Sequence, residues 1–262
     1  MEFTVVTWLW RGWNPIYCAE NVNRLKRKLE KYMSVPFRFV CITDMLEGLE
    51  CETMSLWPFS VIEDSIRREC IIDDQVAAMR ARGHEKPREE FKPLLPDCYR
   101  RLRLFDPTIG AKLGEYVLSL DLDVEIFDDL APMLSFDDDF KILEGLSRNP
   151  YCGSMWWLKT GCFPEVWTEF DMSKLTYAEY DGRPLVGSDQ AWLALKLPGM
   201  PIWANDGSDG TYFIRRLVTA PSWKRMKKPD NCRIVHAAGR IKTTSPQCKM
   251  MVPWLYKAAT ST

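Results

Sequence analysis

The chain has 262 residues, and 46% of them are hydrophobic. That supply of apolar residues can build the core of one α/β domain, which excludes a chain dominated by disorder. The formal net charge of -1 excludes a protein whose whole surface binds polyanions, and no apolar run approaches the roughly 20 residues that cross a bilayer.

Nine cysteines are scattered along the chain without the close spacing of a metal-binding pair. The N-terminus carries Glu2 where a secretory signal would carry positive charge. We therefore expect reduced thiols, no membrane anchor and a cytoplasmic location.

The N-terminal part of the chain alternates between strand and helix patterns. Residues 3–7 form a β-branched apolar run that predicts a strand, and residues 8–15 contain Gly, Asn and Pro, which predicts a loop at its carboxyl end. Residues 17–32 are rich in strong helix formers and predict a helix, after which residues 37–43 return to strand character. This order is typical of a βαβ unit.

A charged segment follows this unit. Residues 64–81 and 98–105 predict helices, and the polar residues 82–96 between them contain proline. We interpret residues 66–96 as an insertion within the domain, either a lid or a surface hairpin.

The strongest strand pattern in the second half of the chain is Tyr-Val-Leu-Ser-Leu at residues 116–120. It predicts a third strand that ends on Asp121. Residues 149–158 and 232–236 are weaker strand candidates, and residues 188–197 predict a short helix with a Ser or Asp N-cap.

The chain contains neither an internal repeat nor a recognisable domain linker, so we expect a single domain that spans residues 1–262. The alternation of strands and helices predicts an α/β fold with a mostly parallel central sheet. In such sheets, ligands bind at the carboxyl ends of the strands.

Asp121 and Asp123 come directly after the predicted strand. In extended chain, residues two apart project to the same side, so both carboxylates could face one ion. Mg²⁺ and Mn²⁺ take oxygen ligands, and such a site leaves coordination positions open for substrate phosphates. The alternative is that the two acids only cap a turn. The apolar residues on both sides favour the cation, because charges among buried residues need compensation.

His236 opens the segment His-Ala-Ala-Gly-Arg-Ile-Lys at residues 236–242. A lone histidine is more often an ordinary core or surface residue than a ligand. Here Gly239 would let the backbone approach a phosphate closely, and Lys242 offers a point charge. We interpret the cluster as a diphosphate clamp whose histidine supplies a nitrogen ligand to the metal.

Residues 187–190, Gly-Ser-Asp-Gln, place a carboxylate and an amide at a helix start. Capping alone would explain Ser188 or Asp189, but it does not explain Gln190. Asp189 and Gln190 together suit vicinal sugar hydroxyls, which need both acceptors and donors.

Charge is unevenly distributed along the chain. Residues 119–139 contain eight acidic residues and no Lys or Arg, whereas residues 214–249 contain ten basic residues and one acid. An acidic site that recruits a cation and a basic site that recruits phosphate could meet in the fold. The basic stretch could also bind nucleic acid. The simpler alternative for both stretches is a solvated surface.

The order of these motifs resembles that of the metal-dependent, GT-A-fold glycosyltransferases related to glycogenin and to the bacterial lipopolysaccharide galactosyltransferases. The resemblance rests on the N-terminal strand and loop, Leu-Asp-Leu-Asp at 120–123, the Gly-Asp-Gln-like site at 187–190 and His-X-X-Gly-X-X-Lys at 236–242. It covers most of the chain and is weakest in the insertion.

The resemblance implies roles for the acidic and C-terminal motifs. Asp121, Asp123 and His236 would bind the metal, Mn²⁺ or Mg²⁺, and Gly239 and Lys242 would bind the diphosphate of a nucleotide-sugar donor.

It also implies roles for residues on other elements. Thr7, Trp8 and Tyr17 would hold the uridine, with Tyr17 stacked on the base. Arg101 stands where the family places a Lys or Arg that contacts the donor.

The sugar pocket is the third part that the resemblance implies. Asp189 and Gln190 match the pair at the transferred sugar, near the reacting face, while Gly153 and Ser154 fall on the strand that lines the pocket. Cys152 stands where relatives often have Asn, which concerns the identity of the donor sugar more than the type of reaction.

Relatives with the terminal His-X-X-Gly-X-X-Lys retain the anomeric configuration, so the resemblance implies a retaining transfer from a UDP-sugar to an acceptor hydroxyl. Some relatives encoded by bacteriophages attach sugars to hydroxymethylated DNA bases in the host cytoplasm, and the basic residues 214–249 would suit such an acceptor.

Two other classes remain as alternatives. Haloacid-dehalogenase-type phosphatases also place Asp-X-Asp after an apolar strand and use the first Asp, here Asp121, as nucleophile. Their motif tends to lie near the N-terminus, whereas this one lies at mid-chain. The other alternative is a non-catalytic nucleic-acid-binding module built on residues 214–249.

Overall fold

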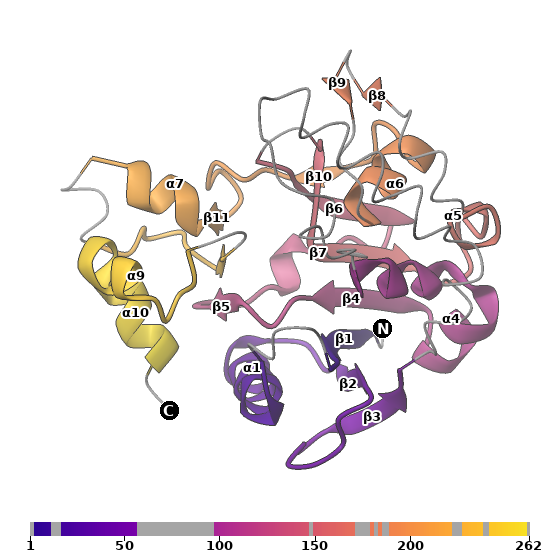
Figure 1. The fold of residues 1–262 in the computed structure, drawn as a ribbon, viewed down its shortest axis with the longest axis horizontal. Helices are drawn as coiled ribbons and strands as arrows, with labels where there is room; N and C mark the ends of the chain where they lie inside the picture. The colour runs from indigo at the N-terminus through magenta and orange to yellow at the C-terminus, as the bar shows by residue number, and fades with distance from the viewer. Residues whose placement is uncertain are drawn as a thin grey trace, which may run out of the picture.

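The computed structural model describes an α/β fold (Figure 1). The predicted insertion at residues 66–96, the predicted helix at 64–81 and Gly239 lie outside the described residues. No helix in the described ranges is long and apolar enough to cross a bilayer. The described ranges are 3–11, 17–56, 97–146, 149–170, 179–180, 183–184, 189–221, 227–237 and 241–260.

Seven strands form the central sheet, in the order β10-β6-β7-β4-β1-β2-β3. Only β7 runs antiparallel to its neighbours, and the other pairs in this sheet are parallel. The predicted α/β fold with a mostly parallel central sheet is therefore confirmed. The bounds are β1 Thr4–Leu9, β2 Arg38–Thr43, β3 Glu52–Ser55, β4 Tyr116–Leu120, β6 Phe140–Glu144, β7 Tyr151–Lys159 and β10 Ile202–Trp203.

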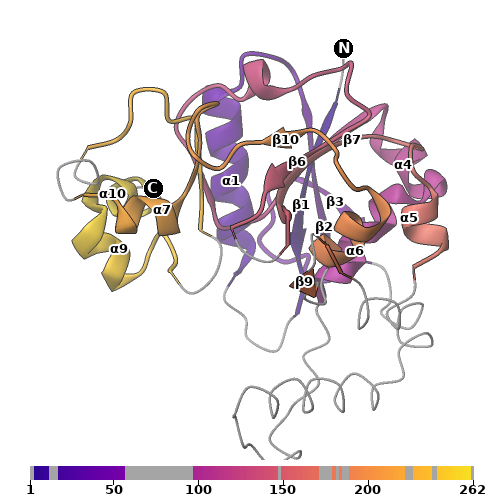
Figure 2. The ribbon, with the colours of Figure 1, turned by 90° about the horizontal axis from the view of Figure 1, so that it is seen from above.

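Helices cover both faces of this sheet. Along β1, Val5 and Leu9 belong to a core shared with helix α1 (Ala19–Tyr32), whereas Val6 and Trp8 belong to the core on the other face. Successive residues of a strand face opposite sides of the sheet, so one apolar strand contributes side chains to both cores. Figure 2 shows α1 on one side of β1 and helices α4 and α6 on the other. The helices of that second face are η2 Asp97–Phe105, α4 Pro107–Leu113, α5 Glu165–Thr168 and α6 Asp189–Lys196.

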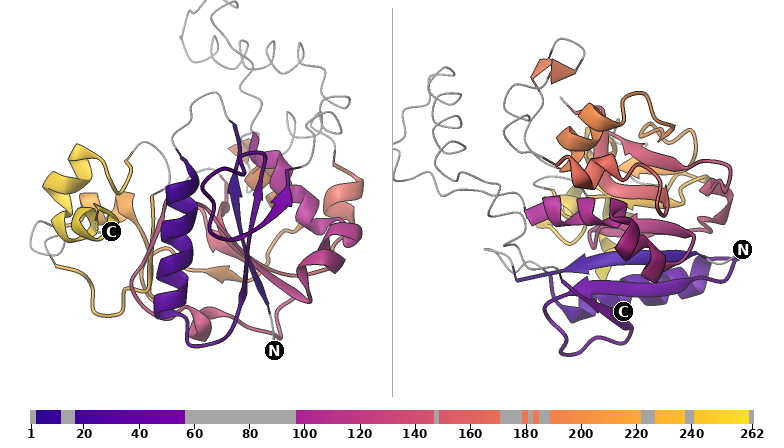
Figure 3. Two further views of the ribbon diagram at one scale, coloured as in Figure 1. Left: turned by 90° about the horizontal axis from the view of Figure 1, so that it is seen from below. Right: turned by 90° about the vertical axis from the view of Figure 1, so that its right-hand side faces the viewer.

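A second, smaller group of elements packs around its own apolar core, and we call it the C-terminal lobe (Figures 1 and 3). Its strands β11 and β12 form a three-stranded sheet with β5 (Val124–Ile126). Because β5 begins directly after Asp123, the lobe is joined to the chain segment that leaves β4. The lobe consists of β11 Thr211–Phe213, α7 Ile214–Thr219, β12 Ile234–His236, α9 Pro246–Met251 and α10 Pro253–Thr260.

A buried ion cluster ties α1 to β5 and α10. The fully buried carboxylate of Glu125 accepts hydrogen bonds from Arg24 Nη1, at 2.9 Å, and from Lys28 Nζ. The same two cations donate to the carbonyl oxygens of Ala259, at 2.8 Å, and Ala258, at 3.1 Å. The last carbonyls of a helix lack partners within it, so these cations complete the end of α10.

The remaining described elements are short, and the eight cysteines in the described part of the chain are all free thiols. These elements are η3 Ala131–Met133, β8 Glu179–Tyr180 and β9 Arg183–Pro184.

Several predicted elements are confirmed with small shifts of their bounds. The strand at 116–120 is β4, the helix at 17–32 is α1 and the strand at 37–43 is β2. The two weaker strand candidates at 149–158 and 232–236 are β7 and β12, and the predicted short helix at 188–197 is α6.

Other predictions need correction. The first strand continues through Trp8 and Leu9, which were assigned to a loop, because both side chains are buried in the cores on either side of the sheet. Residues 98–105 are helical, but the helix η2 is of the 3-10 type. Among the described residues, β4 is the fourth strand and not the third, since the exposed β3 pairs with β2.

Candidate functional site

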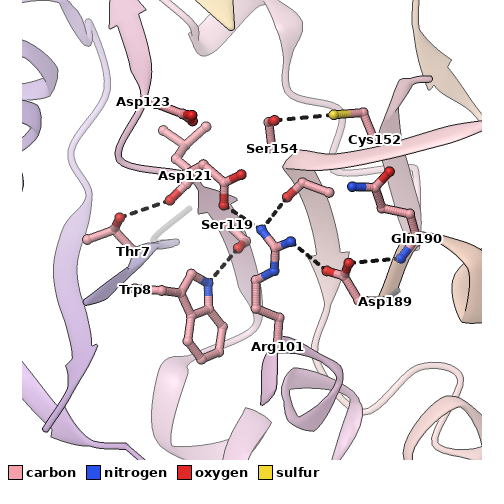
Figure 4. A network of polar contacts seen from close by, with 12 residues as sticks. Thr7, Trp8, Arg101, Ser119, Asp121, Asp123, Cys152, Ser154, Asp189 and Gln190 are labelled. Carbon is pink, nitrogen blue, oxygen red and sulfur yellow. Dashed lines mark hydrogen bonds and ion pairs between the residues drawn. The ribbon is translucent and has the colours of Figure 1, made fainter. Parts of the chain in front are cut away.

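The candidate site lies where β4 ends, near the middle of the sheet (Figure 4). Asp121 follows β4, and Asp123 precedes β5. Between β4 and β5, Leu122 and Asp123 form a turn and not the extended chain assumed from the sequence. The side chains of Asp121 and Asp123 consequently have different partners.

Arg101, from helix η2, joins three elements at this point. Its Nη1 donates to Asp121 Oδ1 and to the carbonyl oxygen of Gly153, the latter at 2.9 Å, while Nη2 lies 2.7 Å from Asp189 Oδ2. Figure 4 shows the guanidinium between Asp121 and Asp189. The Arg101 side chain is 6% exposed, and the ring of Trp156 lies 6.0 Å from its guanidinium carbon. Arg101 is therefore fixed in place at the end of β4, the start of β7 and the start of α6.

A bulge in β7 makes room for this arginine. Ile142 of β6 pairs with Trp156, but the next residue, Leu143, pairs with Cys152. The residues between Cys152 and Trp156 therefore form an irregularity that turns the Gly153 carbonyl toward Arg101. A Cβ atom added to Gly153 would lie 2.8 Å from Arg101 Nη2 and 3.0 Å from Asp189 Oδ2, so the close approach requires glycine.

Asp189 opens helix α6 and is fully buried. Its Oδ1 accepts the backbone N–H of Gln190 at 2.9 Å, and its Oδ2 faces Arg101. A carboxylate at a helix N-terminus is favoured by the helix dipole. Gln190 is partly exposed, so of the two residues it has the more accessible side chain.

Asp123 is bound by residues from both ends of the chain. The Tyr17 hydroxyl donates to Asp123 Oδ2 at 3.1 Å, and Lys242 Nζ donates to the same oxygen at 2.6 Å. Lys242 Nζ also lies 5.9 Å from the centre of the Tyr17 ring. The backbone N–H of Ala237, beside His236, donates to the Asp123 carbonyl oxygen at 3.1 Å. These contacts bring the N-terminal loop and the C-terminal lobe together at Asp123.

The acids at this site change the titration of their neighbours and of each other. Burial raises the pKa of Asp121 to about 6, the charges of Asp123 and Asp189 add to the rise, and the Arg101 guanidinium opposes it. Burial and the carboxylate of Asp123 raise the pKa of Tyr17, so its hydroxyl stays protonated and remains a hydrogen-bond donor.

No protein-family model and no curated protein matches the sequence. In three dimensions the chain is similar to the galactosyltransferase LgtC, solved in complex with donor and acceptor sugar analogues. The identity is 14%, the match covers 99% of this chain and 97% of that one, and the TM-score is 0.51. It is also similar to the glycosyltransferase GlyE of Streptococcus pneumoniae, with 11% identity and a TM-score of 0.55. That match covers 100% of this chain and 61% of GlyE.

The chain has the GT-A glycosyltransferase fold.

Within this GT-A fold, Thr7 and Trp8 support the end of β4 from inside. The Thr7 hydroxyl donates to the carbonyl oxygen of Leu120 at 2.9 Å, and Trp8 Nε1 donates to the Ser119 hydroxyl at 3.1 Å. Both side chains are buried, so their visible role is to hold the strand that presents Asp121. Tyr17, the third residue for which a uridine contact was predicted, is hydrogen-bonded to Asp123 of the acidic pair.

Ser119 was not among the predicted site residues of the GT-A fold. Its signal in the sequence is one serine among the aromatic and aliphatic residues of β4. Ser154, which was predicted, lies on β7 with its hydroxyl 3.2 Å from the Cys152 thiol, and its carbonyl oxygen accepts the N–H of Asp121 at 3.0 Å. Asp121, Ser154 and Gly153 therefore share one corner of the sheet.

His236 lies beside the acidic segment in the sheet of the C-terminal lobe, where it pairs with Val124 of β5. It is fully buried, neither ring nitrogen has a hydrogen-bond partner among the residues that the structure describes, and the Phe213 ring lies 5.8 Å from its ring. Burial lowers the pKa of His236 to about 3, so the imidazole is neutral at physiological pH. A neutral imidazole with a free nitrogen is the form that binds a metal.

The chemistry of these donors fits a divalent cation, because two carboxylates and a neutral imidazole come from adjacent segments. Their arrangement is not that of a closed cage. No three His, Cys, Asp or Glu side chains in the described ranges form a group that could hold a metal ion. The metal-ligand assignment of Asp121, Asp123 and His236 stays a prediction.

Proposed function

We propose that this protein transfers a sugar from a UDP-sugar to an acceptor hydroxyl, with a divalent cation at Asp121 and Asp123. One observation carries the proposal. At the carboxyl end of the central strand β4, each of two acidic side chains has its own cationic partner, Arg101 for Asp121 and Lys242 for Asp123. Ligands of such α/β sheets bind at this edge. The acids there could recruit a divalent cation, and the charges of that cation and of Lys242 would together neutralise a nucleotide diphosphate.

The cation, Mn²⁺ or Mg²⁺, would be held by Asp121, Asp123 and His236 and would supply charge neutralisation for the leaving diphosphate. The fold supports this reading, because the similar structures are glycosyltransferases and LgtC was solved with donor and acceptor sugar analogues.

The chain's own residues have distinct tasks in this proposal. Lys242 is about a third exposed and could reach a diphosphate, while Tyr17 lies beside it and would stack on the nucleoside. Arg101 is buried behind the acidic pair and orients Asp121 and Asp189. Gly239, which lies outside the described residues, would complete the diphosphate clamp.

Gln190 and Asp189 would share the sugar pocket with Gly153 and Ser154. Because Asp189 is buried and bound to Arg101, we assign the contact with the reacting face to Gln190 and the orientation of Gln190 to Asp189. An amide at that face suits a retaining transfer in which the departing diphosphate and the incoming hydroxyl share one side of the sugar.

The phosphatase alternative requires Asp121 as a free nucleophile. Its carboxylate is instead hydrogen-bonded to the buried Arg101 guanidinium, in a fold whose similar structures are glycosyltransferases. We therefore favour the transferase.

The test is a screen of nucleotide sugars with Mn²⁺ that measures release of nucleotide diphosphate. We expect turnover of at least one UDP-sugar, and a loss of about 100-fold or more in Asp123→Ala, since a charge-stabilising group at the reacting centre is removed. Asp137→Ala is the matched control, because Asp137 is an exposed acid of the same segment. Absence of turnover with every donor, or equal rates in wild type and Asp123→Ala, would sink the proposal.

For the acceptor, we propose a hydroxyl on DNA, on the basis of the charge of the C-terminal lobe. Between residues 214 and 249 there are ten basic residues against one acid, Asp230. Arg215 and Arg216, on α7, are exposed, as are Lys227 and Lys228. Such clusters of exposed cations bind phosphate backbones through release of counterions.

The described part of the same lobe has little exposed apolar surface that could enter a bilayer. Met250 is the one large apolar side chain that is strongly exposed in the described part of the lobe. Binding at a membrane interface requires a broad apolar face in addition to positive charge. DNA is therefore the better match.

The acceptor is tested by fluorescence anisotropy of a labelled duplex at several salt concentrations. Lys227→Gln/Lys228→Gln should weaken binding. The slope of the logarithm of the binding constant against the logarithm of salt concentration should become shallower by about two, one for each lost phosphate contact. Lys31→Gln/Lys112→Gln removes two exposed lysines outside the lobe and should bind as wild type does. Anionic vesicles serve as the comparison. Binding of vesicles without binding of DNA, or equal DNA binding by both double variants, would contradict a DNA acceptor.

A further inference from the structure

Both carboxylates of the acidic pair are already bound to cationic side chains of the same chain. Asp121 is bound by Arg101, and Asp123 Oδ2 accepts hydrogen bonds from Lys242, at 2.6 Å, and Tyr17, at 3.1 Å. A divalent cation that binds Asp123 through both carboxylate oxygens would compete with these donors for Oδ2. The pair therefore has internal counter-ions.

The two counter-ions differ in how firmly they are held. Arg101 is 6% exposed and is fixed by Asp121, Asp189 and the carbonyl oxygen of Gly153. Lys242 is 31% exposed. Apart from Asp123, the contacts of its ammonium group with described residues are a long one, 3.4 Å, to the carbonyl oxygen of Ala237 and one with the Tyr17 ring at 5.9 Å. A lysine ammonium sits on a flexible four-carbon stem, so Lys242 can leave and Arg101 cannot.

When Lys242 leaves Asp123, its ammonium group could bind a diphosphate. The ammonium group stands beside the Tyr17 ring, and a nucleotide bound there would place its diphosphate within reach of a long lysine side chain. Two positive charges on one carboxylate repel each other, so a cation that binds Asp123 favours this departure.

We propose that Lys242 is an exchangeable counter-ion of Asp123: a divalent cation displaces it, and the displaced ammonium group then binds the donor's diphosphate. This inference rests on the proposed function. It makes cation and diphosphate binding mutually favourable, because each ligand removes an interaction that opposes the other, and such coupling is reciprocal. In the free protein, Lys242 is a competitor of the metal.

The test measures Mn²⁺ binding in the absence of any nucleotide, through the electron paramagnetic resonance signal of free Mn²⁺. Lys242→Met removes the competitor and should bind Mn²⁺ about 3- to 10-fold more tightly than wild type. This is the effect expected from losing one partly exposed ion pair. Lys242→Arg keeps the charge and should bind as wild type does. Lys249→Met, an exposed lysine of the same lobe, is the matched control and should also equal wild type.

In the presence of Mn²⁺, the affinity for UDP should change in the opposite direction and fall in Lys242→Met. Equal or weaker Mn²⁺ binding by folded Lys242→Met, with its fold checked by circular dichroism, would overturn the inference.

Asp123→Ala separates this outcome from failure of the proposed function. If it binds Mn²⁺ as wild type does, the cation site itself is misplaced. If it loses Mn²⁺ while Lys242→Met gains nothing, the cation site stands and only the exchange is wrong.

Discussion

The carboxylate of Asp189 and the guanidinium of Arg101 form a buried ion pair, with 2.7 Å between Oδ2 and Nη2. The pair sits against the backbone of Gly153, whose missing side chain is what allows the approach. Arg101 also holds Asp121, so one side chain links the acid at the end of β4 to the acid at the start of α6.

Gly153→Ala should disturb this link. The added Cβ would lie 2.8 Å from Arg101 Nη2, and we expect a loss of about 1–3 kcal/mol in the free energy of unfolding and at least about 100-fold in kcat. Gly199→Ala is the control, since its Cβ meets nothing within 4 Å but its φ of +73° strains the backbone. It should lose stability and keep activity. Wild-type kinetics in Gly153→Ala would show that Arg101 need not be held there.

Arg101→Met should destabilise the protein by about 3–5 kcal/mol, because it leaves the buried carboxylate of Asp189 without its cationic partner. Adding Asp189→Leu removes the unpaired buried charge and should restore part of the lost free energy of unfolding. Urea unfolding of the two single variants and the double variant gives the coupling energy. Simple additivity of the single changes would mean that the ion pair contributes no coupling.

Glu125→Gln should also cost about 3–5 kcal/mol, because Arg24 and Lys28 lose the buried carboxylate that neutralises them. Glu52→Gln makes the same change at an exposed pair with Arg38 and should cost under about 1 kcal/mol. Thermal or urea unfolding distinguishes the two. Similar small losses in both variants would indicate that α10 is held by its apolar contacts alone.

Stability should fall in acid because of His236. Its pKa is lowered to about 3 in the folded protein, so below its ordinary value of about 6.5 the unfolded chain binds the extra proton. From pH 7 to pH 5, the free energy of unfolding should drop by about 2 kcal/mol from this group. His236→Gln, measured in EDTA, should lose that part of the pH dependence. An unchanged slope would place the acid sensitivity elsewhere.

The sequence was most informative where one short pattern determines one element. The apolar run of β4 and the two acids after it identified the central strand and the centre of the candidate site. Lys242, from the predicted diphosphate clamp, lies at Asp123. These features depend on local hydrophobicity and on the rule that ligands gather at strand ends.

What could not be predicted depends on partners far away in the chain. Arg101 lies in a run of basic residues that is typical of a solvated surface. Only the fold shows that its side chain is buried and paired with Asp121 and Asp189. The bulge at Gly153 exists because β6 and β7 pair out of register, which a single strand pattern does not reveal. Trp8 was assigned to a loop because Gly, Asn and Pro follow it. Its hydrogen bond to Ser119 is equally non-local, so the sequence does not reveal it.

The central claim is that the site at Asp121 and Asp123 binds a nucleotide diphosphate together with a divalent cation. Isothermal titration calorimetry of UDP into the protein, in Mn²⁺ and then in EDTA, tests it most directly. We predict binding of UDP that requires Mn²⁺ and is lost in Asp123→Ala. Absence of UDP binding in Mn²⁺, or the same affinity in EDTA and in Asp123→Ala, would contradict the claim.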